Sequence, residues 1–318
     1  IVRFKNLDFV QFQKYIHKHW KKNHIFSKEK KIFNFQYKDG RLYNFFLALI
    51  KKRLIGMQGF IDYKIYDKNL KHNQIFLAFW SVIDNSNIGI GLKLHKEIIN
   101  FSKPLFIGVV EVSNATHKAH KWLGFKVKKM HHHALFSKQI LNFKIAKVDK
   151  KKLNFKKLKR KTSFIRLDKK NIFQFVEDSF YNIQIPTKSS EFLIKRYLKH
   201  PVYDYRIYGT LYREKIIAIF VIRPVFLDNS CVLRLVDFIG DNNNFDSIEN
   251  LGNVLLDEFK AEYLDIYSYG IPKKIFKKTN FVDCQNKLNF IVPNRFEPFL
   301  KKNFDIYCAY KTNLKKNN

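Results

Sequence analysis

Residues 75–125 read IFLAFWSVIDNSNIGIGLKLHKEIINFSKPLFIGVVEVSNATHKAHKWLGF, and this stretch decides the fold. The apolar, aromatic run at 75–82 predicts a β-strand that ends in a polar turn. Apolar residues then recur at helical spacing, namely Ile90, Leu94, Ile98 and Phe101. We therefore expect an amphipathic helix over 89–101, a second strand over 105–112, and a short helix that ends at Leu123.

A glycine-rich turn, Gly89-Ile90-Gly91, lies where the first strand gives way to the helix. The N-terminus of a helix exposes backbone N–H groups that bind anions, and glycine lets a phosphate approach that backbone closely. A turn that merely needs a small residue also contains glycine, so Gly-x-Gly alone does not establish a phosphate site. The order strand, glycine turn, helix, strand and short helix favours the anion-binding interpretation.

This order resembles the core of the GNAT family of N-acetyltransferases over residues 45–127. The family has a Gln/Arg-x-x-Gly-x-Gly/Ala turn after its fourth strand, and Ser86-Asn87-Ile88-Gly89-Ile90-Gly91 is similar to that turn. Both glycines match, whereas Ser86 stands where Gln or Arg is usual. The resemblance implies an α/β fold with a mixed (α+β) sheet, and a turn that holds the pyrophosphate of acetyl-CoA.

A second family segment, Asn-…-Ala-…-Tyr-x-x-x-Gly-Phe, follows the fifth strand of that family. Here it is matched by Asn114, Ala115, His120, Gly124 and Phe125. The spacing from Asn114 to Gly124 is one residue short, and His120 stands where a tyrosine is commonly the acid for the CoA thiolate. The resemblance therefore implies that His120 is the acid, with His117 as a second choice.

Acyl transfer to an amine needs a held pyrophosphate, a polarised thioester carbonyl, and groups that move protons. The resemblance assigns acetyl-CoA, as the acyl donor, to Val82, Asn87, Ile88, Gly89, Ile90, Gly91, Leu92 and Asn114. Glu111 ends an otherwise apolar strand beside the expected acceptor, so partial burial would raise its pKa toward that of a useful base. The alternative is a Glu111 that points to solvent or pairs with a lysine.

The acceptor pocket of the family is usually built by its first helix and the loop that follows. Trp20, His24 and Tyr37 are therefore expected acceptor contacts, and ordinary aromatic core packing is the alternative for each. His24 could also reach the site as a base. The segments 43–51 and 54–63 are predicted to form the family's hairpin of second and third strands.

The rest of the chain repeats this order of elements. We predict two GNAT-like domains in tandem: an acyl-CoA-binding domain over 1–145, a basic linker over 146–165, and a degenerate GNAT-like domain over 166–318. The degenerate domain is predicted to have a helix over 247–262, but the turn before it lacks Gly-x-Gly. The linker is either a solvated segment or a docking strip for membrane or nucleic acid.

The 318-residue chain has a net charge of +33, with 60 Lys and Arg against 27 Asp and Glu. This charge favours an anionic partner, although a genome rich in AT codons would give much of the same excess. The cysteines Cys231, Cys284 and Cys308 form no Cys-x-x-Cys pair, so we expect neither a zinc site nor disulfides, and a reducing cytoplasm. No apolar run approaches the roughly 20 residues that span a bilayer.

The tract His131-His132-His133 would place two of its histidines on one face of a strand. No carboxylate or cysteine lies nearby in the sequence. We therefore expect a strand with exposed histidines and no metal site.

The predicted reaction is acetyl-CoA-dependent N-acylation of an amine without a metal. By analogy with enzymes of surface-glycan pathways, the leading acceptor is an amino sugar on a nucleotide or lipid pyrophosphate, in the cytoplasm or at the inner membrane face. Two alternatives remain: a Fem-type transferase that uses aminoacyl-tRNA, and a non-catalytic basic protein that binds nucleic acid or membrane. The sequence has no motif of a hydrolase, an NTPase or a zinc protease.

Overall fold

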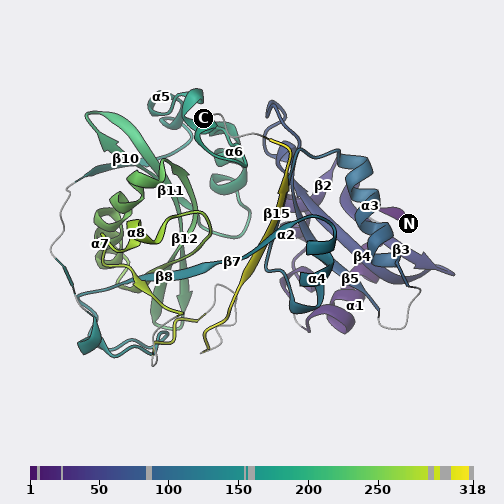
Figure 1. Ribbon diagram of the computed structural model, residues 1–318, viewed down its shortest axis with the longest axis horizontal. Coiled ribbons are helices and arrows are strands. Elements are labelled where there is room, and N and C mark those ends of the chain that lie inside the picture. Colours follow the sequence, from purple (N-terminus) through teal and green to yellow (C-terminus); the bar gives the residue numbers. More distant parts are fainter. Residues whose placement is uncertain are drawn as a thin grey trace. The chain divides into compact units, whose positions relative to one another are not determined.

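The computed structural model describes residues 1–5, 8–22, 24–83, 88–153, 155–156, 162–285, 290–293 and 302–314. The chain divides into two compact units, each with its own sheet (Figure 1). Unit 1 comprises Ile1–Val127, Lys199–Val202 and Ala309–Asn318. Unit 2 comprises Lys128–Leu198 and Tyr203–Cys308.

Unit 1 is built on an eight-stranded sheet with the order β1-β3-β4-β5-β6-β15-β7, in which β2 pairs with β3. The strands are β1 (Val2–Lys5), β2 (Lys38–Asp39), β3 (Leu42–Ile50), β4 (Arg53–Asp62), β5 (Gln74–Val82), β6 (Phe106–Val110), β7 (Lys126–Lys129) and β15 (Tyr307–Thr312). The helices are α1 (Phe9–Tyr15), α2 (Lys30–Tyr37), α3 (Ile90–Ser102) and α4 (Asn114–Trp122), with short 3-10 or π turns at Ile16–Trp20, Ile25–Ser27 and Tyr63–Ile65. The elements predicted over 43–63 and 75–123 are thus confirmed.

Helices cover both faces of the first sheet. On one face, Phe12 of α1 and Phe33 of α2 pack on Phe45 of β3, with ring centroids 5.4 and 5.3 Å away. On the other face, Phe101 of α3 packs on Phe46, with centroids 5.9 Å apart. Alternate residues of a strand point to opposite faces, so consecutive phenylalanines of β3 serve both helix layers.

The two central strands of this sheet separate partway along their length. The parallel pairing of β5 with β6 begins at Gln74↔Phe106 and ends at Leu77↔Val109, although β5 continues to Val82. The β4–β5 register shifts where Phe79 adopts a left-handed backbone, with φ 53°. A bulge of this kind bends a strand and disrupts its ladder, so it accounts for the divergence of β5 from β6.

Unit 2 has a seven-stranded sheet with the order β14-β8-β13-β12-β11-β10-β9. Its strands are β8 (His131–Phe136), β9 (Ser163–Leu167), β10 (Arg206–Tyr212), β11 (Lys215–Leu227), β12 (Ser230–Gly240), β13 (Ala261–Ser268) and β14 (Val282–Asp283). Its helices are α5 (Ile172–Phe175), α6 (Ser190–Leu193), α7 (Ile248–Glu258) and α8 (Lys273–Phe276), with short turns at Lys150–Lys152, Asp178–Ile183, Ile194–Leu198 and Asn242–Ser247. Helix α7 buries Leu251, Leu255 and Leu256 in the core of the unit.

Each sheet contains a strand from the other half of the sequence. The C-terminal strand β15 lies between β6 and β7 in the first sheet, and β8 lies between β13 and β14 in the second. The units therefore have other bounds than the predicted domains 1–145 and 166–318, because 128–145 lies in unit 2 while Lys199–Val202 and Ala309–Asn318 lie in unit 1. Strand pairing decides this arrangement, because an interior strand satisfies backbone groups on both of its edges.

The predicted helix over 247–262 is shorter than expected, because Glu262 belongs to β13 and is buried. Its carboxylate accepts hydrogen bonds from the backbone N–H groups of Lys144, Ile145 and Ala146 at 2.6–3.0 Å. The start of the predicted linker is thereby fixed to unit 2. Further along it, Leu153 is also buried in the core of that unit, while residues 154 and 157–161 lie outside the described residues.

Candidate active site

The N-terminus of α3 supplies an anion-binding backbone in unit 1. Gly89 is the residue that caps the helix, with φ 87° in the left-handed region, and no side chain of the described residues caps the N–H groups there. A Cβ at Gly89 would meet none of the described residues within 4 Å, so glycine is needed here for its backbone conformation. Ser86 and Asn87 lie outside the described residues, whereas Ile88 is fully exposed beside the turn.

The second glycine of the turn has a different role. A Cβ at Gly91 would lie 3.0 Å from Nε1 of Trp80, and that indole N–H donates a 3.0 Å hydrogen bond to the Gly91 carbonyl. Gly91 therefore lets β5 and α3 approach each other, and sequence reasoning had assigned it only to phosphate binding. Val82 is the last residue of β5, and Leu92 lies in the first turn of α3.

A group of aromatic and histidine side chains fills the space between α3 and α4. The Trp80 ring stacks on His95 at 5.6 Å and meets the edge of His120 at 5.2 Å. Phe125 lies 5.3 Å from His120 and 5.9 Å from His95. These contacts fix α4 and the Gly-Phe that follows it against the helix that carries the glycine turn.

The surroundings of His120 disfavour its predicted role as an acid. Its ring is buried, which lowers its pKa and favours the neutral form at pH 7. Its Nδ1 lies 2.8 Å from the Thr116 carbonyl, which can only accept, so the one N–H of the neutral ring is used there. His120 is therefore held as a packed, hydrogen-bonded side chain in the group around Trp80.

The burial of His95 predicts how the stability of the protein depends on pH in the acid range. Burial, together with the charges of His120 and Lys311, lowers its pKa to about 4. In the unfolded chain His95 binds a proton below about pH 6.5, whereas in the folded protein it stays neutral down to about pH 4. His95 therefore leaves the free energy of unfolding unchanged above pH 6.5 and lowers it progressively as the pH falls from 6.5 to 4. Replacing His95 by Phe should reduce the loss of unfolding free energy between pH 7 and pH 5 by roughly 2 kcal/mol.

Urea denaturation at both pH values measures this difference. The exposed His17, replaced by Gln, serves as the control and should leave the pH dependence as in the wild type. An unchanged pH dependence in His95→Phe would show that His95 does not remain neutral in the folded protein.

Glu111 follows β6 directly, where β5 and β6 have already separated. Its side chain is half-buried, and its backbone is left-handed with φ 67°. That conformation costs a residue other than glycine about 1 kcal/mol, and such strain is concentrated at functional sites. Asn114 is the first residue of α4, four positions after the end of β6, and follows the N-cap residue Ser113. Its side chain is exposed.

The three predicted acceptor contacts meet around the bulged residue of β5. The Phe79 ring centroid lies 5.3 Å from Trp20, 5.4 Å from His24 and 6.5 Å from Tyr37. Trp20 is 45% exposed, whereas Tyr37 is buried and packs at 4.7 Å on Phe45. The structure thus brings the predicted residues together, and Tyr37 also has the core-packing role that was its alternative.

His24 has a tautomer that does not suit a base. Its Nδ1 accepts a 3.2 Å hydrogen bond from the Phe26 backbone N–H, so the neutral ring carries its proton on Nε2. Burial and the nearby Lys21 lower its pKa to about 4, which keeps the ring neutral at pH 7. His24 can therefore donate a hydrogen bond from Nε2, but it has no lone pair there for a proton.

Sequence reasoning missed three side chains at this end of β5. Phe79 and Trp80 hold the two helix layers described above, and Ser81 shares a 3.1 Å hydrogen bond with the Tyr15 hydroxyl of α1. Their positions depend on the bulge, and no signal in the sequence marked it.

Unit 2 departs from this arrangement at the corresponding turn. Between β12 and α7, the Asp241 side chain accepts from the Asn243 N–H and begins a 3-10 turn over Asn242–Ser247. A carboxylate at this position repels a phosphate, and the turn contains no Gly-x-Gly.

The histidine tract was predicted to be exposed, and this is wrong for His132 and His133, which are both buried. The reason is the interior position of β8 in the second sheet. The His132 Nε2 lies 3.0 Å from Oδ2 of the buried Asp265, and the His133 ring stacks on Phe276 at 3.7 Å. Within the described ranges, no group of three or more His, Cys, Asp or Glu side chains could hold a metal ion.

Comparison with solved structures finds the same fold in two proteins described as acetyltransferases. A GCN5-related N-acetyltransferase from Anabaena variabilis matches 97% of this chain and 71% of its own, with a TM-score of 0.57 and 8% identity. A protein from Pyrococcus horikoshii, provisionally described as an acetyltransferase, matches 100% of this chain and 90% of its own, with a TM-score of 0.56 and 10% identity. No protein-family model matches the sequence, and no curated protein does.

The chain therefore has a GNAT-like fold with two mixed α/β units in tandem. The turn before α7 in the second unit contains no Gly-x-Gly, and the degenerate character of that unit stays a prediction. No helix among the described residues is long and apolar enough to cross a membrane.

Proposed function

We propose that this protein transfers an acyl group, acetyl in the simplest case, from acyl-CoA to an amine. The observation that carries the proposal is the divergence of β5 from β6 beside the N-terminus of α3, where Gly89 has no side chain to cap the helix. The divergence leaves strand edges that can pair with an extended pantetheine arm, and the helix N-terminus suits its pyrophosphate. Both features lie in unit 1 and are supported by the GNAT-like fold.

The proposed residues each have one task. Backbone N–H groups of Ile90, Gly91 and Leu92, with Ile88 and Gly89 before them, hold the pyrophosphate; Val82 and Asn114 line the arm. Glu111 takes one proton from the acceptor ammonium, and the free amine then forms the new C–N bond at the thioester carbonyl as the C–S bond breaks. CoA leaves as a thiolate and takes up the second proton that the amine releases. Trp20, His24 and Tyr37 form the acceptor side around Phe79, where His24 donates from Nε2.

The acceptor that we favour is an amino sugar on a nucleotide or lipid pyrophosphate. The net charge of +33 suits such an anionic acceptor, and it would also suit peripheral contact with a membrane face or nucleic acid. A role in polysaccharide biosynthesis in the cytoplasm follows from this choice. The glycine turn of unit 1 disfavours the alternative of a Fem-type transferase that uses aminoacyl-tRNA.

A charge placed beside the turn tests the site. Ile88 is fully exposed, so Ile88→Glu should leave the fold intact and repel the pyrophosphate. Affinity for acetyl-CoA should fall about tenfold, or 1.4 kcal/mol, as measured by calorimetry. This position is preferable to Gly91, where any side chain meets Trp80.

Ile88→Gln is the matched control, since it has the same shape as Ile88→Glu without the charge. It should bind acetyl-CoA within about twofold of the wild type. Equal affinity in the Glu and Gln variants would exclude this turn as the pyrophosphate site. Binding of RNA, with no detectable binding of acetyl-CoA, would instead favour the non-catalytic alternative.

A further inference from the structure

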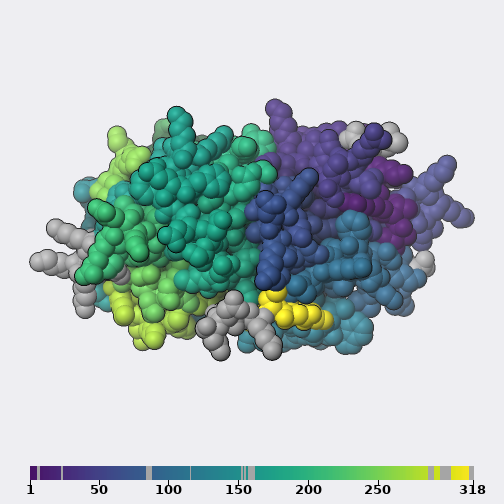
Figure 2. All heavy atoms as spheres, turned by 90° about the horizontal axis from the view of Figure 1, so that it is seen from above, coloured from purple at the N-terminus to yellow at the C-terminus, as the bar shows by residue number. Residues whose placement is uncertain are grey.

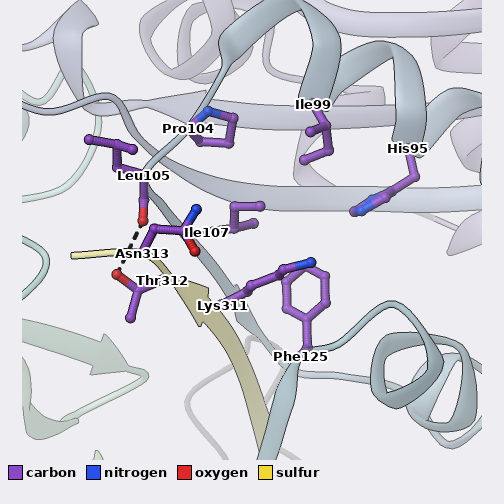
Figure 3. Close-up of a pocket in the computed structure, with 9 residues that line it drawn as sticks. All are labelled: His95, Ile99, Pro104, Leu105, Ile107, Phe125, Lys311, Thr312 and Asn313. Atoms are coloured by element: carbon purple, nitrogen blue, oxygen red, sulfur yellow. Dashed lines mark hydrogen bonds between the residues drawn. The ribbon is translucent and has the colours of Figure 1, made fainter. Parts of the chain in front are cut away.

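Unit 1 contains a cavity of about 200 Å³ away from the glycine turn. The cavity is lined by the later part of α3, by the start of β6 and by the C-terminal strand β15 (Figure 3). Gly89 precedes α3, whereas Pro104 and Leu105 at the cavity follow it, so most of the cavity lies toward the C-terminal end of the helix and His95 enters it from the middle. The cavity is therefore separate from the proposed acyl-CoA site.

The walls of the cavity are mostly apolar. They comprise Ile99, Pro104, Leu105, Ile107 and Phe125. A cavity of about 150 Å³ lined by similar side chains holds a benzene molecule. The volume here is thus sufficient for a ring or a branched chain of similar size that carries one polar substituent.

Four polar residues also line the cavity, namely His95, Lys311, Thr312 and Asn313, and the Thr312 hydroxyl donates to the Leu105 carbonyl at 3.1 Å. The His95 ring, 5% exposed, points into the cavity, and its buried Nδ1 has no hydrogen-bond partner among the described residues (Figure 3). Lys311 of β15 lies opposite and donates from Nζ to the Leu123 carbonyl at 3.2 Å. An ammonium has three N–H donors, so Lys311 can keep this bond and still pair with a ligand.

The lysine also lies near solvent. Lys311, Thr312 and Asn313 are exposed, and in the space-filling view the yellow C-terminal residues lie at the surface (Figure 2). A ligand can therefore enter beside β15 with its apolar part inward and its charge toward Lys311.

We propose that this cavity binds a small monocarboxylate with an apolar body of about the size of benzoate. The carboxylate pairs with the Lys311 ammonium, and the His95 imidazole gives it a hydrogen bond. One cation and one imidazole match a single negative charge, and the five apolar residues of the lining suit an apolar body behind it. A neutral imidazole, which the burial of His95 favours, is a donor at one nitrogen only, and this suits one carboxylate oxygen. The proposal does not depend on acyl transfer.

Titration of the full chain with sodium benzoate, followed by calorimetry or NMR at constant ionic strength, tests the site. Benzoate should bind with a dissociation constant of about 1 mM or below, and benzamide, the neutral analogue, at least about tenfold more weakly. Lys311→Met should weaken benzoate binding at least about tenfold and leave benzamide binding nearly unchanged. Lys96→Met, which removes an exposed lysine from the same unit, should bind benzoate as the wild type does.

Two further variants locate the ligand. Leu105→Phe fills the cavity from a partly exposed position and should abolish binding of both compounds. His95→Phe keeps the ring shape and should weaken benzoate more than benzamide. No binding of benzoate at about 10 mM would overturn the proposal, as would equal binding of benzoate and benzamide. Benzoate binding that survives both Lys311→Met and Leu105→Phe would place the ligand elsewhere and also overturn it.

Discussion

Replacing Glu111 by Gln should slow acyl transfer about a hundredfold while acetyl-CoA affinity stays within about twofold, because the amide cannot accept the proton of the attacking ammonium. A hundredfold decrease corresponds to about 2.7 kcal/mol of activation free energy. Gln has nearly the same shape as Glu, so the left-handed backbone at this position, with φ 67°, bears the same cost in both proteins. Single-turnover acetyl transfer to the amine that the wild type acetylates fastest in an amine panel measures the effect.

Glu97→Gln is the control for this experiment. Glu97 is an exposed residue of α3, and its replacement removes one negative charge from the same unit without touching the strand edges. Its turnover should equal that of the wild type. If Glu111→Gln also keeps nearly normal turnover on this acceptor, Glu111 is not the base, and proton removal through water becomes the next hypothesis, since His24 has its proton on Nε2.

A chain that ends at Phe304 should lose the ordered structure of unit 1, because it lacks the strand that pairs with both β6 and β7. Three hydrogen bonds from the end of this strand to unit 1 would also be lost: Lys311 Nζ to the Leu123 carbonyl, Thr312 Oγ1 to the Leu105 carbonyl, and Asn313 N to the Leu105 carbonyl. Unpaired strand edges in the middle of a sheet are costly, so the remaining strands would not hold β6 in place. We expect β6 amides to exchange rapidly with solvent and acetyl-CoA to give no thermal stabilisation.

The control is a chain that ends at Leu314, which retains β15 and should behave as the full chain does. A synthetic peptide covering residues 303–314, added to the shorter chain, should restore acetyl-CoA stabilisation by adding the missing strand. A chain ending at Phe304 that still binds acetyl-CoA with wild-type affinity would show that β15 is dispensable for the site.

The sequence predicted the local elements of unit 1 well because their signals are local. The apolar spacing at 90–101 gives α3, and the alternation of strand and turn residues gives β3 to β6. The bulge at Phe79 had no such signal, since a left-handed phenylalanine depends on its neighbours in the sheet. The bulge nevertheless decides where Trp20, His24 and Tyr37 meet.

The histidines also show that properties of single residues which depend on tertiary contacts cannot be predicted from the sequence. His120 matched a family position, but its tautomer depends on the Thr116 carbonyl and its pKa on burial. His132 had no acidic neighbour in the sequence, yet the fold places Asp265 at 3.0 Å. A pKa and a tautomer depend on groups that are distant in sequence, so composition and spacing cannot reveal them.

The sequence by itself determined the class of fold, the glycine turn at the start of α3 and the lack of such a turn in the second half. These follow from backbone conformation and apolar periodicity, which act over a few residues. Only the tertiary structure decided which strands complete each sheet. Strand pairing joins residues far apart in the chain, as in β15 beside β6, and the cavity beside Lys311 exists only because of that pairing.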